Sequence, residues 1–153
     1  MKQVPETRSD HPSMLALADY ISRELQRIGI VPVPVADNPH ETIEQVRANM
    51  GTRYKVWSGA SDRTIWPTAQ ANWNFRALHD WQHVLTGSDF TLHGERDASE
   101  FLVKTLPPAL RRRYGAILRA EVYGQAMVAL RDGTFAADQV AFTLSFLSGE
   151  IKQ

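Results

Sequence analysis

Two histidines and two carboxylates gather in a short stretch of the chain, where together they could bind a metal ion. The segment His79-Asp80-Trp81-Gln82-His83 is followed by Glu95 after eleven intervening residues. If the segment is helical, His79 and His83 lie on one face, separated by about 40° around the axis. Asp80 lies about 100° from His79, with His83 between them, so the three side chains can reach one point. Imidazoles with a nearby carboxylate suit zinc, iron, cobalt or manganese.

Glu95 follows a loop that contains Gly87 and Gly94 and is long enough to fold back over the helix. The carboxylate can therefore add an oxygen to the same site. The predicted metal ligands are His79, Asp80, His83 and Glu95, with zinc as the favoured ion and iron or manganese as alternatives. The competing interpretation is the solvent-facing side of an amphipathic helix that happens to carry two histidines.

Two carboxylates are candidates for catalysis, Asp80 and Glu121. Asp80 is either a ligand or the carboxylate that orients an imidazole. Glu121 falls within or beside the apolar side of its predicted helix, and a buried carboxylate needs a partner. That partner is either an arginine such as Arg76 or Arg119, or a metal site where Glu121 would be a further ligand or the general acid/base. His93 is a surface-loop histidine, an alternative ligand or a proton shuttle.

The composition is that of an ordinary soluble globular protein, and it excludes several kinds of site. The chain has 153 residues, of which 43% are hydrophobic and 22% are charged. It has no cysteine, which excludes disulfides, thiolate catalysis and cysteine-bound metals. The 17 basic and 17 acidic residues balance, so the charge gives no strong signal for nucleic-acid binding. A polar N-terminus and the lack of a long apolar run predict no transmembrane segment and a cytoplasmic location.

The spacing of apolar residues predicts a mainly α-helical protein. The first 11 residues read as a flexible arm, and residues 12–153 as one helical metal-binding domain of five to six helices. Residues 30–35 alternate valine and proline and should form an extended connector or an edge strand. Residues 53–58 could form a short strand or part of a hairpin. The predicted helices span residues 12–28, 38–50, 67–86, 94–106, 108–130 and 136–149.

The metal-binding segment resembles a known family. Residues 78–87, together with Gly94-Glu95, are similar to the core segment of the ubiquinone-biosynthesis accessory proteins of the fourth Coq type. These are helical zinc-binding proteins whose signature is HDxxH followed eleven residues later by glutamate. The resemblance covers about residues 75–96. It implies that His79, Asp80, His83 and Glu95 bind the metal, and that the ligand is an isoprenoid-bearing aromatic molecule from which a carboxyl group is removed oxidatively.

A second and weaker resemblance is to uncharacterised phage and plasmid proteins. These carry a Phe-Arg-Ala-x-His-Asp segment, here residues 75–80, with a later Gly-Glu. This likeness implies no function.

Three functions remain open from the sequence. The first is a metal-dependent lyase or hydrolase that acts on a small or lipid-like substrate. The second is a non-catalytic, metal-stabilised module that binds a prenyl lipid or a protein, with a homodimer as one option. Four protein ligands that close a tetrahedron would favour this module. Three aromatic residues could line a ligand pocket in either case, although such residues more often belong to the core: Trp57, Trp66 and Tyr123.

The third function is an HD-type metal-dependent phosphohydrolase. It would use His40, the pair His79-Asp80, and either Asp132 or Asp138. This scheme gives no role to the second histidine of the HDxxH motif or to the glutamate that follows it. A zinc peptidase is less well supported, because Asp80 is one methylene shorter than the glutamate base of the HExxH motif.

Overall fold

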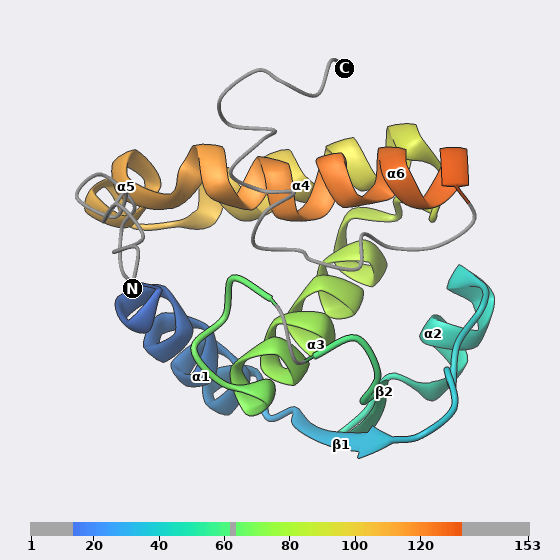
Figure 1. The fold of residues 1–153 in the computed structure, drawn as a ribbon. Helices are drawn as coiled ribbons and strands as arrows, with labels where there is room; N and C mark the ends of the chain where they lie inside the picture. The colour runs from blue at the N-terminus through green and yellow to red at the C-terminus, as the bar shows by residue number, and fades with distance from the viewer. Residues whose placement is uncertain (1–13, 62–63, 133–153) are drawn as a thin grey trace, which may run out of the picture.

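The protein is mainly α-helical, as the sequence predicts, and its two strands form a parallel sheet (Figure 1). The computed structural model describes residues 14–61 and 64–132. The elements are α1 (Leu15–Ile28), β1 (Val31–Val35), α2 (Ile43–Asn49), β2 (Arg53–Trp57), α3 (Ala69–Thr86), α4 (Leu92–Thr105), α5 (Pro108–Arg119), the π-helical turn η1 (Ala120–Gly124) and α6 (Gln125–Asp132). The predicted arm at residues 1–11 and the predicted helix at 136–149 lie outside the described residues. The division into an arm and a single domain stays a prediction.

Local capping interactions set the ends of the first two helices. Gly29 ends α1 with a left-handed backbone (φ 88°), and its N–H donates to the carbonyl of Leu25. The predicted start of the second helix near residue 38 is wrong, because α2 begins at Ile43. Thr42 and Gln45 form a capping box there, in which each side chain accepts a hydrogen bond from the other residue's backbone.

The two helices that carry the predicted metal ligands also begin at threonine caps. Thr68 Oγ1 accepts a hydrogen bond from the N–H of Ala71 at 3.0 Å, and Thr91 Oγ1 accepts one from Gly94 at 3.1 Å. α3 therefore starts at residue 69 instead of 67, and α4 starts at 92 instead of 94. Glu95 consequently lies in the first turn of α4, after the helix has begun.

The sheet pairs the valine-proline segment with the predicted strand at residues 53–58. Val31 lies opposite Arg53, and Val35 lies opposite Trp57, in parallel register. The N–H of Val31 donates to the carbonyl of Thr52, so alternate residues of β1 face β2 and the two prolines face away. Prolines are tolerated at such positions because no N–H is required there. The predictions of an extended segment and of a short strand are both confirmed, whereas the alternative of a hairpin is wrong, because the two strands are parallel and α2 lies between them in the chain.

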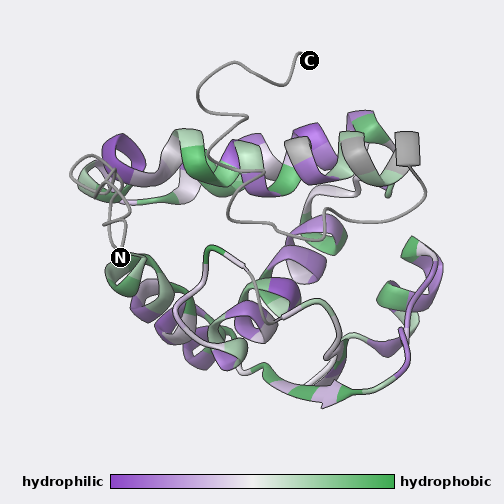
Figure 2. Cartoon of the chain, in the orientation of Figure 1, coloured by the Kyte–Doolittle hydropathy of each residue, from purple (hydrophilic) through white to green (hydrophobic). Residues whose placement is uncertain are grey.

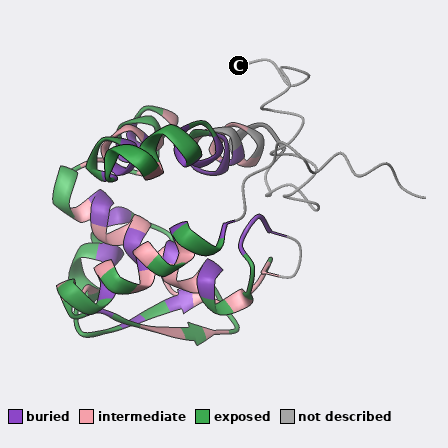
Figure 3. Ribbon diagram, turned by 90° about the vertical axis from the view of Figure 1, so that its left-hand side faces the viewer, coloured by how far each residue is buried: buried purple, intermediate pink, exposed green. Residues whose placement is uncertain are grey.

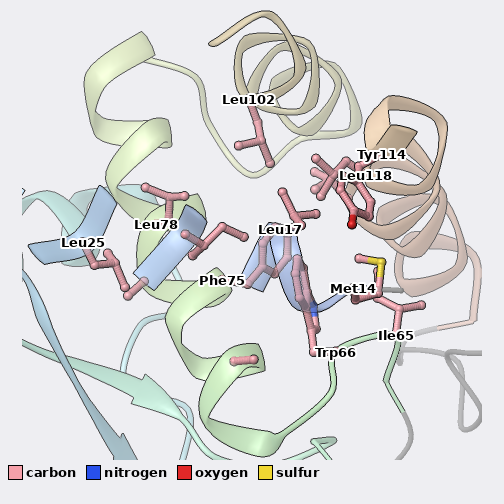
Figure 4. Close-up of a cluster of buried hydrophobic side chains, with 14 of the residues drawn as sticks. Met14, Leu17, Leu25, Ile65, Trp66, Phe75, Leu78, Leu102, Tyr114 and Leu118 are labelled. Carbon is pink, nitrogen blue, oxygen red and sulfur yellow. The ribbon is translucent and has the colours of Figure 1, made fainter. Parts of the chain in front are cut away.

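Helix α3 is the central element of the fold. It packs against α1, α2 and both strands on one side and against α4 on the other (Figure 1). Buried residues lie where the elements face one another, and exposed residues cover the outside (Figure 3). Figure 4 shows side chains of α1, α3, α4 and α5 meeting in one core, where Leu17, Leu78, Leu102 and Leu118 are each at most 2% exposed. Three of the four metal-ligand candidates, His79, Asp80 and His83, thus lie on a helix that is packed on several sides.

Hydrophilic and hydrophobic residues alternate along the helices (Figure 2). Among residues 14–61 and 64–132, no helix has the length and apolar character needed to cross a membrane.

Candidate metal centre

Two imidazoles and one carboxylate converge where α3 and α4 meet. Nε2 of His79 lies 2.9 Å from Oε2 of Glu95, and Nε2 of His83 lies 3.2 Å from the same oxygen. The two Nε2 atoms are 3.1 Å apart, and the rings meet edge to face. His83 is fully buried, whereas His79 and Glu95 keep a small exposed fraction. The three residues form a group that could hold a metal ion.

The spacing of these donor atoms matches that of ligands around a metal. Donors about 2.1 Å from an ion are about 3.0 Å apart at adjacent octahedral positions and about 3.4 Å apart in a tetrahedron. The three measured separations, from 2.9 to 3.2 Å, lie in or next to this range. An ion can therefore enter with only small shifts of the side chains. The distances fit both geometries and leave the identity of the metal open.

The turn between the helices brings Glu95 to the histidines. Gly87 ends α3 with a left-handed backbone (φ 71°), and the N–H of Glu95 donates to the carbonyl of Thr91 at 2.8 Å. Gly94 lies directly against Asp89, where a Cβ atom would overlap the Asp89 carbonyl oxygen. Only glycine allows this close approach, and it fixes the first turn of α4 against the end of α3.

The other ring nitrogen of His83 favours the tautomer that binds metals. Nδ1 of His83 lies 3.3 Å from the carbonyl oxygen of Ser88 and 3.0 Å from Ser88 Oγ. A carbonyl oxygen can only accept, so this contact favours a hydrogen on Nδ1 and a lone pair on Nε2. That lone pair faces the carboxylate of Glu95, which is also an acceptor. A cation between them resolves the conflict, and a backbone acceptor behind a metal-bound histidine is the usual arrangement.

In the metal-free protein, protons on the histidines take the place of that cation. Burial raises the pKa of Glu95, but the charges and hydrogen bonds of His79 and His83 outweigh it and lower the pKa to about 2. Burial lowers the pKa of His79, but Glu95, with contributions from Asp80 and Glu121, raises it overall. The site is therefore built to hold positive charge beside an ionised carboxylate.

Asp80, the fourth predicted ligand, lies beside the group and has a different partner. Its Oδ2 accepts a hydrogen bond from the hydroxyl of Tyr54 in β2 at 2.6 Å. Burial raises the pKa of Asp80, opposed by the charge of His79 and by this hydrogen bond. His40 stacks on the Tyr54 ring with centroids 4.9 Å apart, and its ring nitrogens have no partner within the described chain. The sequence gives no signal for Tyr54 at this site beyond the alternating pattern of its strand.

His93 does not join the site. Its side chain is 83% exposed and lies 3.3 Å from Asp97, one turn further along α4. Its interpretation as a surface histidine agrees with this position, but it lies in the first turn of α4 and not in a loop.

Glu121 lies in η1, where the chain departs from α-helical geometry, as π-helical turns often do near functional sites. It is 7% exposed, and its Oε2 has no hydrogen-bond partner among the described residues. Burial raises its pKa to about 7, although the charges of Arg76 and His79 and the nearby indole N–H of Trp66 oppose this. The predicted ion pairs are not formed in the described structure. Arg119 instead binds Glu100 at 2.7 Å.

A cavity of about 450 Å³ connects Glu121 to the histidine group. It lies between α3, η1 with α6, β2 and the segment before α2, and His79 and Glu95 form part of its wall. Its apolar walls include Trp57, one of the three aromatic residues for which the sequence left open either the core or a pocket. Trp66 instead stacks on Phe75 in the core at 4.8 Å, and Tyr123 is not among the lining residues. His79 and Glu95 of the metal group thus face a partly open cavity large enough for a small molecule.

Comparison with known proteins gives no relative from which a function could be carried over. No protein-family model matches the sequence, no curated protein matches it, and no solved structure matches the fold.

Proposed function

We propose that this protein is a metal-dependent enzyme in which His79, His83 and Glu95 hold one divalent ion at the wall of the cavity. The convergence of three donor atoms from α3 and α4 carries the proposal. Three protein ligands with a vacant position are typical of catalytic metal sites, whereas structural zinc sites use four protein ligands. Asp80, the fourth predicted ligand, is instead hydrogen-bonded to Tyr54. This favours a coordination position of the ion that no protein ligand occupies and that is open toward the cavity.

A bound ion would polarise a substrate oxygen or lower the pKa of a coordinated water, which suits a hydrolase or a lyase. Other residues of the chain would transfer protons, fix the charges around the ion and exclude water. Glu121, with a pKa of about 7, can accept or release a proton near neutral pH, and it lines the same cavity as His79. Asp80 and Tyr54 would keep the negative charge beside His79 in a fixed position. The aromatic walls would exclude water from the substrate.

Zinc is the favoured ion because two imidazoles and a carboxylate are one of its usual catalytic donor sets. Iron(II) and manganese are alternatives, since two histidines and one carboxylate on one face also bind non-haem iron. Membership in the ubiquinone-biosynthesis family, and with it an isoprenoid-like ligand, stays a prediction that the local resemblance alone supports. A homodimer and the phage-type relationship are likewise untested.

The alternative is a non-catalytic metal-stabilised module, which would need Asp80 or another protein group to complete the coordination. The HD-type phosphohydrolase is supported less well. His79 pairs with Glu95, which that scheme leaves without a role, and His40 does not join the three-residue group. The side chain of Asp132 and all of Asp138 lie outside the described structure.

Cobalt substitution tests the proposal. Protein treated with a chelator and reloaded with Co(II) should bind one ion per chain and show the visible absorption of a low-symmetry site. Replacing His79, His83 or Glu95 by alanine should abolish stoichiometric binding, whereas His93→Ala, on the exposed side of α4, should leave it unchanged. Retained binding in all three variants would refute the site.

Azide then separates an enzyme from a structural module. An open coordination position would let azide enter, which changes the Co(II) absorption spectrum. An unchanged spectrum at saturating azide would indicate a closed site and favour the module.

A further inference from the structure

The cavity has a second polar surface, formed by two side chains of η1 and α6. Glu121 and Gln125 lie four residues apart, line the cavity and are 7% and 4% exposed. Oε2 of Glu121 and both amide atoms of Gln125 have no hydrogen-bond partner in the part of the chain that the structure describes. Buried polar atoms without partners are rare because leaving them unpaired is costly. These three atoms, together with both ring nitrogens of His40 and Nδ1 of His79 on other lining residues, indicate a ligand that completes some of their bonds.

The chemistry of these atoms defines the complementary group. Gln125 offers one N–H donor group and one carbonyl acceptor, and Glu121 adds a carboxyl oxygen. A ligand that accepts from Gln125 Nε2 and donates to Gln125 Oε1 or Glu121 Oε2 needs a carbonyl and an N–H side by side. A carboxamide has this edge. An ester accepts but does not donate, and a carboxylate likewise offers only acceptors to an edge that needs a donor.

The rest of the cavity fits a neutral ligand better than an anion. The guanidinium of Arg76 donates to the carbonyl oxygens of Trp57 and Ala60 and lies over the Trp57 ring, 5.2 Å from its centroid. These contacts use two of the five N–H groups of the guanidinium. Lys55, the other lysine or arginine of the lining, is exposed. Phe75 and Phe90, with Trp57, provide aromatic surface for the apolar part of a ligand.

We propose that the cavity binds a small apolar or aromatic carboxamide, whose amide edge pairs with Gln125 and Glu121. The proposal rests on the proposed function in placing this ligand beside a metal centre. The amide contact itself requires no ion, so the two proposals can fail separately.

Three probes of similar shape test the inference: benzamide, methyl benzoate and benzoate. Their affinities for the chain, with and without Co(II), can be measured by calorimetry or ligand-observed NMR. We expect benzamide to bind at least about tenfold more tightly than either of the others to the metal-free protein, the gain of one or two hydrogen bonds to buried groups. Equal affinities, a preference for benzoate, or no binding of any probe would overturn the inference.

Two buried glutamines provide a matched pair of variants. Gln125→Leu should abolish the preference for benzamide. Gln82→Leu should keep it, because Gln82 is also buried, at 3% exposed, with an unpartnered Oε1, but lies outside this cavity. A preference that survives in Gln125→Leu would refute the role of this residue. Melting curves establish that the variants fold, and Gln125→Met repeats the test with a flexible side chain of similar volume.

The metal and amide measurements have separate meanings. Stoichiometric Co(II) binding without an amide preference would leave the metal centre standing and refute the carboxamide. An amide preference in a protein that binds no Co(II) would do the reverse.

Discussion

At the scale of single residues, Glu121 is a buried carboxyl group whose pKa is shifted far from its ordinary value. Its pKa is raised from 4.5 to about 7 by burial, so ionisation costs the folded state more than the unfolded state. The penalty is absent below about pH 4.5, grows as the pH rises to about 7, and is constant above. Metal-free Glu121→Gln should therefore be more stable than wild type by about 3 kcal/mol above pH 7.

Urea unfolding at a series of pH values measures this effect. The stability difference should shrink to almost nothing near pH 4.5. Glu44→Gln, at an exposed position of α2, is the control for the change from a carboxylate to an amide. A constant difference across the range would show that Glu121 does not titrate as stated.

Tyr54 has a structural role toward Asp80 that the sequence does not reveal. Its fully buried hydroxyl donates to the Asp80 carboxylate, and Tyr54→Phe would leave that carboxylate without this donor. We expect a loss of about 1–3 kcal/mol in the free energy of unfolding, the usual cost of an unsatisfied buried polar group. Tyr20→Phe, at a partly exposed position of α1, is the control and should change stability by much less. Similar values for the two variants would contradict a special role for Tyr54.

At the scale of elements, the turn between α3 and α4 determines whether the carboxylate reaches the histidines. A Cβ on residue 94 would overlap the backbone of Asp89, so Gly94→Ala must push the first turn of α4 outward. We expect a loss of about 1–3 kcal/mol in stability and a clear drop in Co(II) affinity, because Glu95 moves with that turn. Gly51→Ala meets no atom within 4 Å and should leave Co(II) affinity unchanged. Equal metal affinity in the two variants would refute the coupling.

The sequence predicts the helices and the histidine pair because both depend on local spacing. The i, i+4 separation of His79 and His83 fixes their common face whatever the rest of the chain does. The helix starts are less predictable, since Thr42, Thr68 and Thr91 compete as caps with nearby asparagine, proline and glycine residues. The π-helical turn has no simple sequence signal and was not foreseen.

Contacts between distant elements cannot be derived from periodicity. The sequence suggested that Asp80 could reach the same point as the histidines, and helix geometry permits it. The structure gives Asp80 a different partner because β2 brings Tyr54 to the side of α3. Neither arginine suggested for Glu121 forms an ion pair with it in the described structure, for a similar reason. Arg119 binds Glu100 of α4, and Arg76 donates to backbone carbonyl oxygens. Which acid joins the imidazoles is decided by packing among α3, α4 and β2.

At the scale of the whole molecule, a bound ion would tie α3 to α4 and so join the two sides of the fold. An ion that binds only the folded chain stabilises it by about 2.7 kcal/mol at a free concentration 100 times its dissociation constant. The melting temperature should therefore rise with zinc or Co(II) and return to its initial value with chelator. Glu95→Gln should lose most of this rise, and His93→Ala should keep it.

The size of that metal-dependent rise should depend on pH with a definite sign. In the metal-free protein, protonated His79 beside ionised Glu95 substitutes for the ion. The raised pKa of His79 contributes stability that is full below about pH 6.5 and is lost as the pH rises through the raised value. The lowered pKa of Glu95 contributes stability that is full above about pH 4.5 and is lost as the pH falls toward 2.

The pair of His79 and Glu95 should thus stabilise the metal-free protein most at mildly acidic pH, where protons also compete best with the ion. The rise in melting temperature on adding metal should therefore be small near pH 5.5 and larger toward pH 8. A rise that becomes smaller over this interval would contradict a site in which the ion and the proton compete for the same position.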